Sequence, residues 1–211
     1  MDCPLCFSHK KVIHFKSQNR VYYRCEICEL IYLDSKCYLN ADEEKAHYDC
    51  HENNLEDPNY RQYLKQFIDP LNEFLNKETS GLDFGCGRAP LLAKMCEELG
   101  HKMSYYDPFF YPDQSAIDKT YDFIIAVEVL EHLHRPKETL DQILSQLAQD
   151  GILSFVTELY SEKTDFEGWY YKNDPTHVIF FSEKTFSWLE SEFPLECVYR
   201  EKRQRIFKKL V

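Results

Sequence analysis

The 211-residue sequence has no apolar run long enough to cross a membrane, and no apolar segment precedes its first cysteine. We therefore expect neither a membrane span nor a secretion signal. The chain also lacks an excess of basic residues, because its formal net charge is −11, whereas a general nucleic-acid surface is normally basic. Internal repeats and low-complexity tracts are missing as well. With 44% apolar residues, the length suits one sizeable domain plus an appendage.

Four of the nine cysteines are arranged as two Cys-x-x-Cys pairs: Cys3, Cys6, Cys25 and Cys28. Each pair can place two thiolates on one side of a tight turn, and the two pairs together complete a tetrahedral zinc shell. Residues 11–15 and 21–24 are predicted to be short strands, so residues 1–35 are predicted to form a zinc ribbon. Four thiolates leave no open position, and the zinc is therefore expected to be structural.

The alternative is four free cysteines, which would leave this small segment without a stabilising core. Clustered cysteines favour a metal in a reducing cytoplasm over disulfides, so we predict a cytoplasmic protein.

Residues 80–90 read as a strand, a glycine turn and a helix start in one piece. Asp83 lies at the end of the strand, and Gly85 and Gly87 allow the backbone to bend tightly and approach a ligand. This pattern indicates a nucleotide-type site at the carboxyl end of a first parallel strand. A dinucleotide fingerprint needs a third glycine where Pro90 stands, so a nicotinamide dehydrogenase is disfavoured.

The pattern Asp83-x-Gly85-x-Gly87 resembles motif I of the class I S-adenosylmethionine-dependent methyltransferases. Three later segments match the same family in order, and they are residues 101–107, 121–133 and 147–155. The resemblance covers roughly residues 78 to 160. It implies an α/β fold with a doubly wound, mostly parallel, seven-stranded Rossmann-like sheet in residues 78–211, which binds S-adenosylmethionine.

The elements of that sheet are expected at these places: strands near 80–84, 102–106, 121–127 and 151–157, helices near 90–99, 136–149 and 182–192, and a final antiparallel hairpin of 195–199 and 204–210. Before them, residues 36–77 are predicted to be a helical connector with helices at 41–48 and 60–75.

By the same resemblance, the first acid and the glycine turn border the methionine portion of the cofactor. A carboxylate at the end of the second strand can accept both ribose hydroxyls, and the end of the fourth strand lies near the adenine or the cofactor's edge. The predicted cofactor-binding residues are Asp83, Gly85, Cys86, Gly87, Asp107, Pro108, Glu128 and Val129.

Three residues are candidates for acid/base chemistry. Glu131 and His132 follow the fourth strand and suit acid/base work or a metal contact, although Glu131 is equally suited to the first turn of a helix. His177 begins a His-x-x-Phe-Phe-Ser segment that looks like the substrate-side insertion of small-molecule methyltransferases. It would remove a proton from the acceptor; the alternative is an aromatic plug that closes the sheet.

Substrate contacts are predicted in two places. The connector carries Tyr48 and His51, which are candidates for a lid, with a docking helix as the alternative. The aromatic insertion near 159–181 carries Trp169 and Tyr170, which are weaker candidates.

The predicted function is therefore methyl transfer from S-adenosylmethionine to a small-molecule, metabolite-type acceptor. Besides the nicotinamide dehydrogenase that Pro90 disfavours, two alternatives stay open. One is an rRNA or tRNA methyltransferase that uses the zinc ribbon for docking, which the net charge disfavours. The other is a non-catalytic cofactor-binding interaction module, which the retained Asp83 and Asp107 disfavour.

Overall fold

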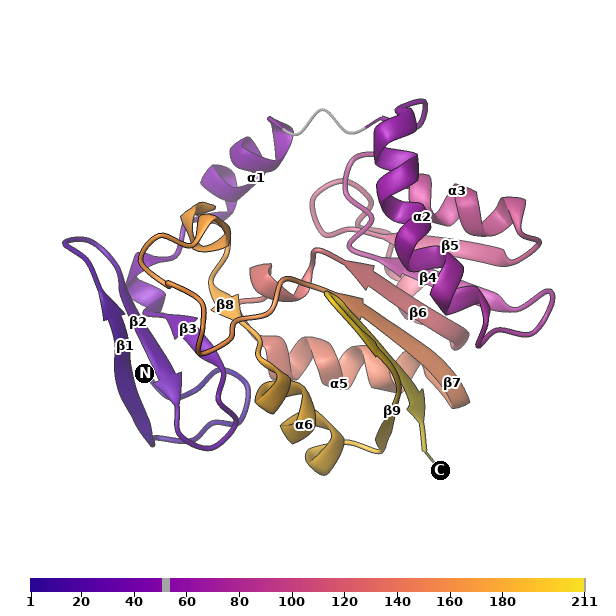
Figure 1. The fold of residues 1–211 in the computed structure, drawn as a ribbon. Coiled ribbons are helices and arrows are strands. Elements are labelled where there is room, and N and C mark those ends of the chain that lie inside the picture. The colour runs from indigo at the N-terminus through magenta and orange to yellow at the C-terminus, as the bar shows by residue number, and fades with distance from the viewer. Residues whose placement is uncertain (51–53, 211) are drawn as a thin grey trace.

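The computed structural model describes residues 1–50 and 54–210, whose strands form two sheets (Figure 1). The larger sheet has six strands in the order β5-β4-β6-β7-β10-β9. Strands β5, β4, β6 and β7 pair in parallel, and β10 is antiparallel to both of its neighbours. The strands are β4 (Ser80–Phe84), β5 (Lys102–Tyr106), β6 (Tyr121–Val127), β7 (Leu147–Val156), β9 (Leu195–Glu201) and β10 (Gln204–Lys209).

Helices cover both faces of this sheet, so the doubly wound arrangement is confirmed. On one face, α2 (Pro58–Asn72) and α3 (Leu91–Glu98) pack against a group that includes Phe123 and Ile125. The alternate residues Ile124 and Ala126 face the other side, where the core includes residues of α5 and α6. Side chains of a strand alternate between faces, and both faces are buried here, which explains why β6 is a continuous apolar run.

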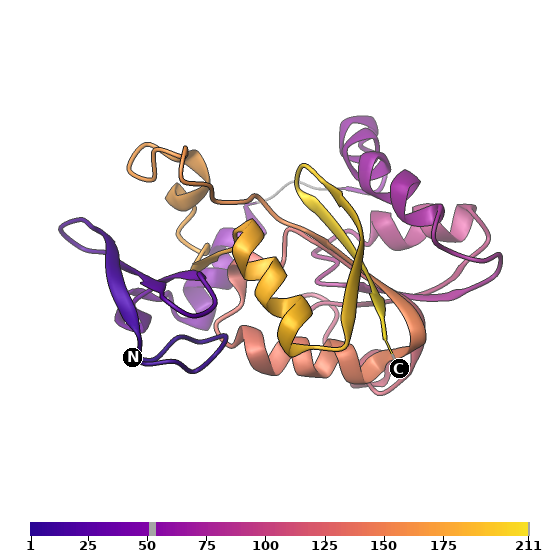
Figure 2. The same cartoon turned by 60° about the horizontal axis from the view of Figure 1, so that its bottom comes forward.

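Figure 2 shows α5 (Pro136–Gln146) and α6 (Glu183–Glu192) side by side on this second face. The final hairpin is present as β9 and β10, as expected. The fifth predicted strand begins earlier than expected, because β7 starts at Leu147 and α5 ends at Gln146. Leu147 pairs with Tyr121 and Ile152 pairs with Phe123, so residues 148–151 form a bulge in which Asp150 has a φ of +59°.

The prediction of seven strands is wrong, because the described residues give this sheet six. Between β5 and β6 the chain has only the loop around Pro108 and Pro112 and the short α4 (Gln114–Ile117). A further parallel strand would need a crossover of a dozen or more residues on each side. Strand β5 is therefore an edge of the sheet.

The smaller sheet joins the cysteine-rich segment to the aromatic insertion. Its order is β1-β2-β3-β8, with β1 (Lys11–Lys16), β2 (Val21–Cys25), β3 (Ile31–Leu33) and β8 (Ile179–Phe180). Ile31 pairs with Phe180 and Tyr32 with Ile179, so a strand from far along the chain completes this sheet. One hydrophobic core runs from Cys3 through the insertion to Phe207. The domain boundary at residue 35 stays a prediction, and the core continues across it.

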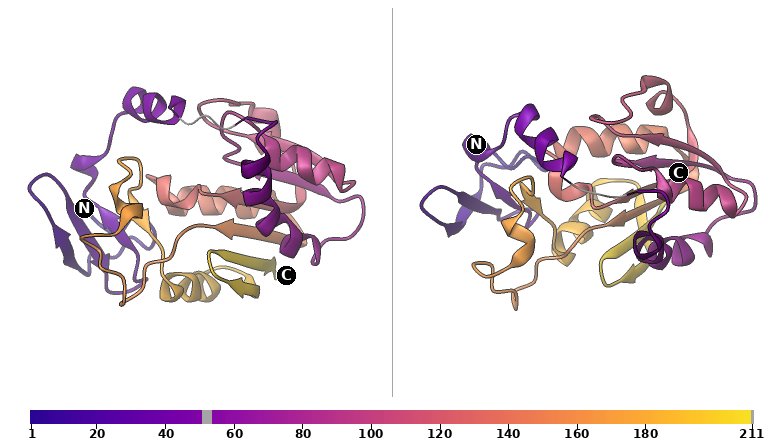
Figure 3. Two further views of the ribbon diagram at one scale, coloured as in Figure 1. Left: turned by 45° about the horizontal axis from the view of Figure 1, so that its top comes forward. Right: turned by 90° about the horizontal axis from the view of Figure 1, so that it is seen from above.

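Both connector helices are present, as α1 (Ala41–Asp49) and α2. A capping box between Asn40 and Glu43 starts α1, and Pro58 occupies the first turn of α2. Figure 3 shows α1 beside the ribbon and apart from α2. Short 3₁₀ turns complete the described elements: η1 (Ser35–Cys37), η2 (Leu130–His132) and η3 (Tyr170–Asn173). Within the described part of the chain, no helix is long and apolar enough to span a membrane.

Candidate active site

The glycine turn lies between the end of β4 and the start of α3. The Gly85 and Cys86 N–H groups donate to the Tyr106 carbonyl at 2.8 and 3.1 Å, which fastens the turn to β5. Gly85 has a φ of +76°, and a Cβ there would lie 2.5 Å from a methyl carbon of Val129. Gly87 has a φ of +64°, and a Cβ there would meet nothing within 4 Å. The first glycine is therefore needed for packing, whereas the second faces open space that a ligand can use.

Asp107 organises the same turn from the end of β5. One carboxylate oxygen accepts the Gly87 N–H at 3.0 Å, and the other accepts the N–H groups of Phe109 and Phe110 at 2.9 and 3.1 Å. The side chain is buried and lines the cavity described below. Three backbone donors keep this carboxylate in one position beside the glycine turn.

Asp83 lies behind the turn rather than in the cavity. Burial raises the pKa of its carboxyl to about 7, while the Ala93 N–H in the first turn of α3 opposes that rise. Its Oδ2 atom has no hydrogen-bond partner among the described residues. Asp83 therefore acts on the glycine turn through the start of α3.

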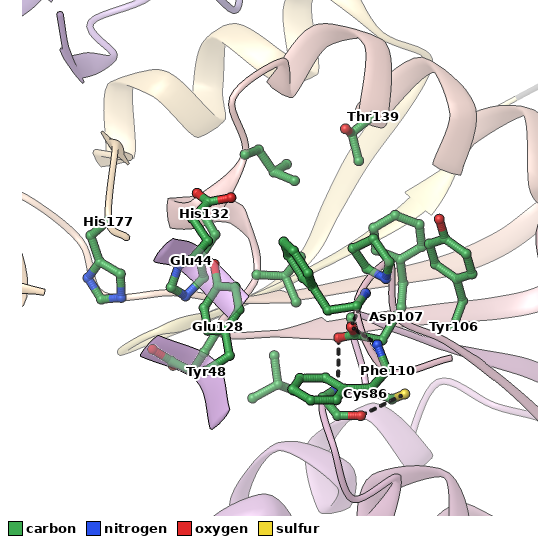
Figure 4. A pocket seen from close by; sticks show the side chains of 18 of the residues that line it. Glu44, Tyr48, Cys86, Tyr106, Asp107, Phe110, Glu128, His132, Thr139 and His177 are labelled. Atoms are coloured by element: carbon green, nitrogen blue, oxygen red, sulfur yellow. Dashed lines mark hydrogen bonds between the residues drawn. The ribbon is translucent and has the colours of Figure 1, made fainter. Parts of the chain in front are cut away.

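A cavity of about 670 Å³ opens at the carboxyl ends of β4, β5 and β6 (Figure 4). The glycine turn, Asp107 and Pro108 form one end, and Glu128 and Val129 line it from the end of β6. Tyr48 of α1 and Tyr60 and Tyr63 of α2 line it from the connector, while His132 and His177 lie at the opposite end. This is the position at which open α/β sheets bind ligands, and the volume suits a small molecule.

The Glu128 carboxylate contacts three protein groups at the cavity wall. It accepts the Tyr63 and Tyr171 hydroxyls at 3.0 and 3.1 Å and forms an ion pair with Arg203 at 2.7 Å. Burial, and then the neighbouring Glu131, raise the pKa of Glu128 to about 7, whereas Arg203 opposes the rise. Glu128 thus ties the connector, the insertion and the C-terminal hairpin together at the cavity wall. Tyr63 and Arg203 are contacts that the sequence did not predict, because no local motif marks them.

The insertion brings His177 to within ring contact of His132, with ring centroids 4.6 Å apart. Burial, and then His132, lower the pKa of His177 to about 4, so the ring is neutral at pH 7. Asp174 also lines the cavity, and its carboxylate accepts the Thr176 hydroxyl and lies 3.2 Å from a ring nitrogen of His47. Asp174 is a third residue that the sequence did not single out, after Tyr63 and Arg203.

The remaining predicted substrate residues lie elsewhere. Trp169 packs inside an aromatic cluster with Phe166 and Phe180, and Tyr170 is 65% exposed beside Glu158. Neither is among the residues that line the cavity. Aromatic side chains in an insertion serve the core as well as a ligand, and the sequence pattern does not distinguish the two. His51 lies outside the described residues.

The cysteines of the two Cys-x-x-Cys motifs lie together beside the small sheet. All four Sγ atoms lie within 4.8 Å of one another, with Cys3 and Cys28 3.5 Å apart and Cys6 and Cys25 3.4 Å apart. The two pairs form matching turns. In the first, the Phe7 N–H donates to the Cys3 carbonyl; in the second, the Glu29 N–H donates to the Cys25 carbonyl.

Phe7 and Glu29, which follow the second cysteine of each pair, have φ values of 57° and 61°. Two turns of the same conformation facing each other can hold one zinc ion in a thiolate shell.

The ribbon also holds the insertion in place. Arg20 donates to the main-chain carbonyls of Lys172 and Pro175 at 3.4 and 3.0 Å. The Leu33 N–H donates to the Val178 carbonyl at 2.8 Å, and the Val178 N–H donates to the Glu131 carbonyl at 2.8 Å. The segment that carries His177 is thus fixed between the ribbon and the end of β6.

Comparison with known proteins identifies the fold and the family. No curated protein matches the sequence. Among solved structures, the 1,6-didemethyltoxoflavin-N1-methyltransferase of Burkholderia thailandensis, with 1,6-didemethyltoxoflavin and S-adenosylhomocysteine bound, is 14% identical with a TM-score of 0.53. The match covers 96% of this chain and 100% of that chain. At this identity the likeness shows the fold.

Two weaker matches are a possible histamine N-methyltransferase of Thermotoga maritima and a methyltransferase candidate from Bacillus halodurans. The first is 15% identical with a TM-score of 0.43, covering 72% of this chain and 95% of that one. The second is 15% identical with a TM-score of 0.48, covering 64% and 70%.

A family model described as a methyltransferase domain matches residues 57–199, which is more than half of the chain. The matched range includes the glycine turn, Asp107, the end of β6 and the insertion with His177. It begins after the ribbon and α1. The chain therefore belongs to the methyltransferase-domain family, and the protein is a methyltransferase.

Proposed function

We propose that this enzyme transfers the methyl group of S-adenosylmethionine to a small-molecule acceptor. The observation that carries the proposal is one continuous cavity with two chemically different ends. The glycine turn and Asp107 suit the cofactor, and the two histidines with Asp174 suit an acceptor. The fold is also similar to that of a methyltransferase crystallised with S-adenosylhomocysteine and 1,6-didemethyltoxoflavin.

In this proposal the cofactor's methionine portion lies along Gly85, Cys86 and Gly87, and its ribose hydroxyls reach Asp107. Pro108 and Val129 border the nucleoside, and Glu128 holds that wall through its ion pair with Arg203. Asp83 stabilises the start of α3 behind the turn. The sulfonium is itself the reactive group, so the protein contributes chiefly alignment.

His177, His132 and Glu131 remain the candidates for acid/base chemistry. A neutral His177 can accept a proton at pH 7, although its pKa of about 4 makes it a weak base. Tyr48 of α1 closes over the same end, with its ring 5.4 Å from that of His132 and 5.3 Å from that of Phe109. We therefore assign α1 as part of the acceptor wall.

We also propose that Cys3, Cys6, Cys25 and Cys28 hold a structural zinc ion. Four thiolates fill a tetrahedral shell, so the ion would hold the two turns together rather than take part in chemistry. Because the ribbon contacts the insertion through β3 and Arg20, the ion would support the acceptor end of the cavity. Location in a reducing cytoplasm stays a prediction.

Methylation of RNA through ribbon docking is less favoured. Arg24 is occupied by Glu29 and Glu162, and Arg20 is used by the insertion. These internal contacts remove two of the ribbon's basic side chains from a phosphate-binding role.

The test has two parts. First, calorimetry should show S-adenosylmethionine binding that Asp107→Ala weakens at least roughly tenfold, a loss of about 1.4 kcal/mol or more. Exposed Asp42→Ala on α1 serves as the control. Second, methyl-labelled cofactor is incubated with the enzyme and a fractionated cell extract. Label in the small-molecule fraction supports the proposal, label in RNA or protein contradicts the acceptor class, and cofactor binding without any transfer supports the non-catalytic alternative.

A further inference from the structure

Three potential metal ligands converge at the acceptor end of the cavity. They are Glu131, His132 and His177, and one ligand atom of each lies within 4.8 Å of the others. Glu131 and His132 come from η2 directly after β6, whereas His177 comes from the insertion. The hydrogen bond from the Val178 N–H to the Glu131 carbonyl joins these two segments. Figure 4 shows both histidines at the end of the cavity away from Asp107 and Cys86.

Only one of the two Glu131 carboxylate oxygens accepts a hydrogen bond from the described residues. The side chain is 0% exposed, and its Oε2 atom accepts the Thr157 hydroxyl at 2.9 Å. Its Oε1 atom has no hydrogen-bond partner among the described residues. Arg203 pairs with Glu128 and Glu158, so its charge is already balanced by two other carboxylates. A buried carboxylate oxygen without a partner is costly, and a cation beside it would remove that cost.

Both histidine rings are oriented by the main chain. The Nδ1 atom of His177 lies 2.6 Å from the Tyr171 carbonyl oxygen, and that of His132 lies 3.2 Å from the Thr176 carbonyl oxygen. A carbonyl oxygen only accepts, so each Nδ1 carries a proton, and in the neutral form of each ring the Nε2 atom carries the lone pair that a metal ion uses. Metal-binding histidines are commonly held in this way, with the second nitrogen donating to a carbonyl or a carboxylate.

We propose that Glu131, His132 and His177 bind one divalent cation, separate from the zinc of the ribbon. Two imidazoles and one carboxylate suit zinc, iron or cobalt better than magnesium. Metal–ligand distances of about 2.0–2.2 Å require the three ligand atoms to lie closer together than they do in this structure, so the three side chains would adjust when the ion binds. Three protein ligands leave a coordination position toward the cavity, where an acceptor oxygen would bind. With the cation bound, its charge would promote loss of the acceptor proton in place of a histidine base. These last two consequences rest on the proposed function; the metal site itself does not.

The experiment counts metal ions in the full-length protein with Co²⁺ as the probe. Thiolate-bound cobalt gives an intense charge-transfer band, whereas a site of imidazole and carboxylate does not, so the spectra distinguish the two sites. After removal of unbound metal, mass spectrometry should find two cobalt ions per wild-type chain. His177→Ala and Glu131→Gln should retain one ion, with the charge-transfer band unchanged. His134→Ala should retain two, because His134 lines the same cavity but pairs with Glu44 at 2.8 Å.

The thermal midpoint of each variant checks that the variant is folded. If His177→Ala is unstable, the metal count of Glu131→Gln tests the proposal, because glutamine preserves the shape of the glutamate side chain. A wild-type chain with only the thiolate-bound ion would overturn the proposal, as would two ions in Glu131→Gln. Cofactor binding is measured separately by calorimetry. Its failure would remove the proposed methyl transfer and leave the metal count unaffected.

Discussion

Single residues shape the cofactor end of the cavity mainly through the backbone. Gly85 and Gly87 both have positive φ values, yet only Gly85 has a side chain pressed against it. Asp107 was predicted to bind a ligand, but its carboxylate also accepts one hydrogen bond from the glycine turn and two from the loop after β5. The same few atoms therefore decide both the stability of the turn and its fit to a cofactor.

Alanine substitutions of the two glycines should separate these effects. Gly85→Ala should lower the free energy of unfolding by about 2–4 kcal/mol, because it adds overpacking against Val129 to the strain of a positive φ. Gly87→Ala should cost only about 1 kcal/mol of stability, since its methyl group enters open space, but cofactor affinity should fall roughly tenfold or more. Urea denaturation and calorimetry measure the two quantities. Equal stabilities of the two variants would contradict the packing argument.

Asp83 should make the stability of the protein depend on pH. Its folded-state pKa of about 7 lies above the ordinary value of 3.8, so between these values the folded protein keeps a proton that the unfolded chain has lost. The contribution of Asp83 to stability therefore falls as pH rises through this window, by up to about 1.4 kcal/mol per pH unit, and is constant above it.

Asp83→Asn removes that titration and keeps an acceptor for the Ala93 N–H. The difference in unfolding free energy between the variant and the wild type should therefore increase from pH 4 to pH 7. Urea denaturation at a series of pH values measures it, and parallel pH profiles would refute the assignment.

At the scale of elements, the insertion is held by parts of the chain that are distant in sequence. Strand β8 has two residues, which is too short to be stable alone, and it pairs with β3 of the ribbon. Arg20 adds two hydrogen bonds from the ribbon to the same segment. The position of His177 therefore depends on the ribbon as well as on the sheet that carries the cavity.

Arg20→Met should loosen the insertion without weakening cofactor binding. Loss of both carbonyl contacts should raise hydrogen exchange of the amides of residues 172–178 by roughly tenfold, equivalent to about 1.4 kcal/mol of local stability. Lys16→Met is the matched control, since Lys16 is an exposed cation on the same ribbon. The idea fails if both variants exchange alike, or if Arg20→Met reduces affinity for S-adenosylmethionine as strongly as Asp107→Ala.

At the scale of the whole molecule, the ribbon and the methyltransferase fold share one hydrophobic core. Cys3, Cys25 and Cys28 are fully buried in that core together with Tyr32 and Ile31. If zinc holds the two turns, its binding energy contributes to the folding of the acceptor wall.

Removal of zinc should therefore affect more than the ribbon. A strong chelator should lower the main thermal transition by more than about 10 °C and abolish hydrogen-exchange protection in β3, β8 and the loop with His177. Hydrogen-exchange protection in β4 and β6 should persist at moderate temperature. Added zinc should restore protection in β3, β8 and the loop with His177. Unchanged protection in β8 after complete zinc removal would show that the ribbon is an independent appendage.

Local patterns in the sequence determined much of this protein. The alternation of glycine turn, apolar strand and capped helix predicted β4, α3, β6 and α6, because these elements depend on nearby residues. Ser182 and Thr185 form a capping box at the start of α6, and Gly100 follows the end of α3 with a φ of +96°. The four cysteines were predicted to converge from their spacing, and their Sγ atoms do lie together.

The tertiary structure decided what depends on distant partners. The sheet ends at β5, because the chain between β5 and β6 is too short to add another parallel strand. The family resemblance predicted seven strands and did not reveal this edge. Trp169 packs in the core and His177 lines the cavity, although both lie in one aromatic segment. The difference arises because β3 and Arg20, which lie more than 140 residues earlier in the chain, orient that segment. The pairing of Glu128 with Arg203 likewise joins β6 to the final hairpin. Such long-range contacts leave no local pattern, so the sequence predicted the elements and the fold placed the site.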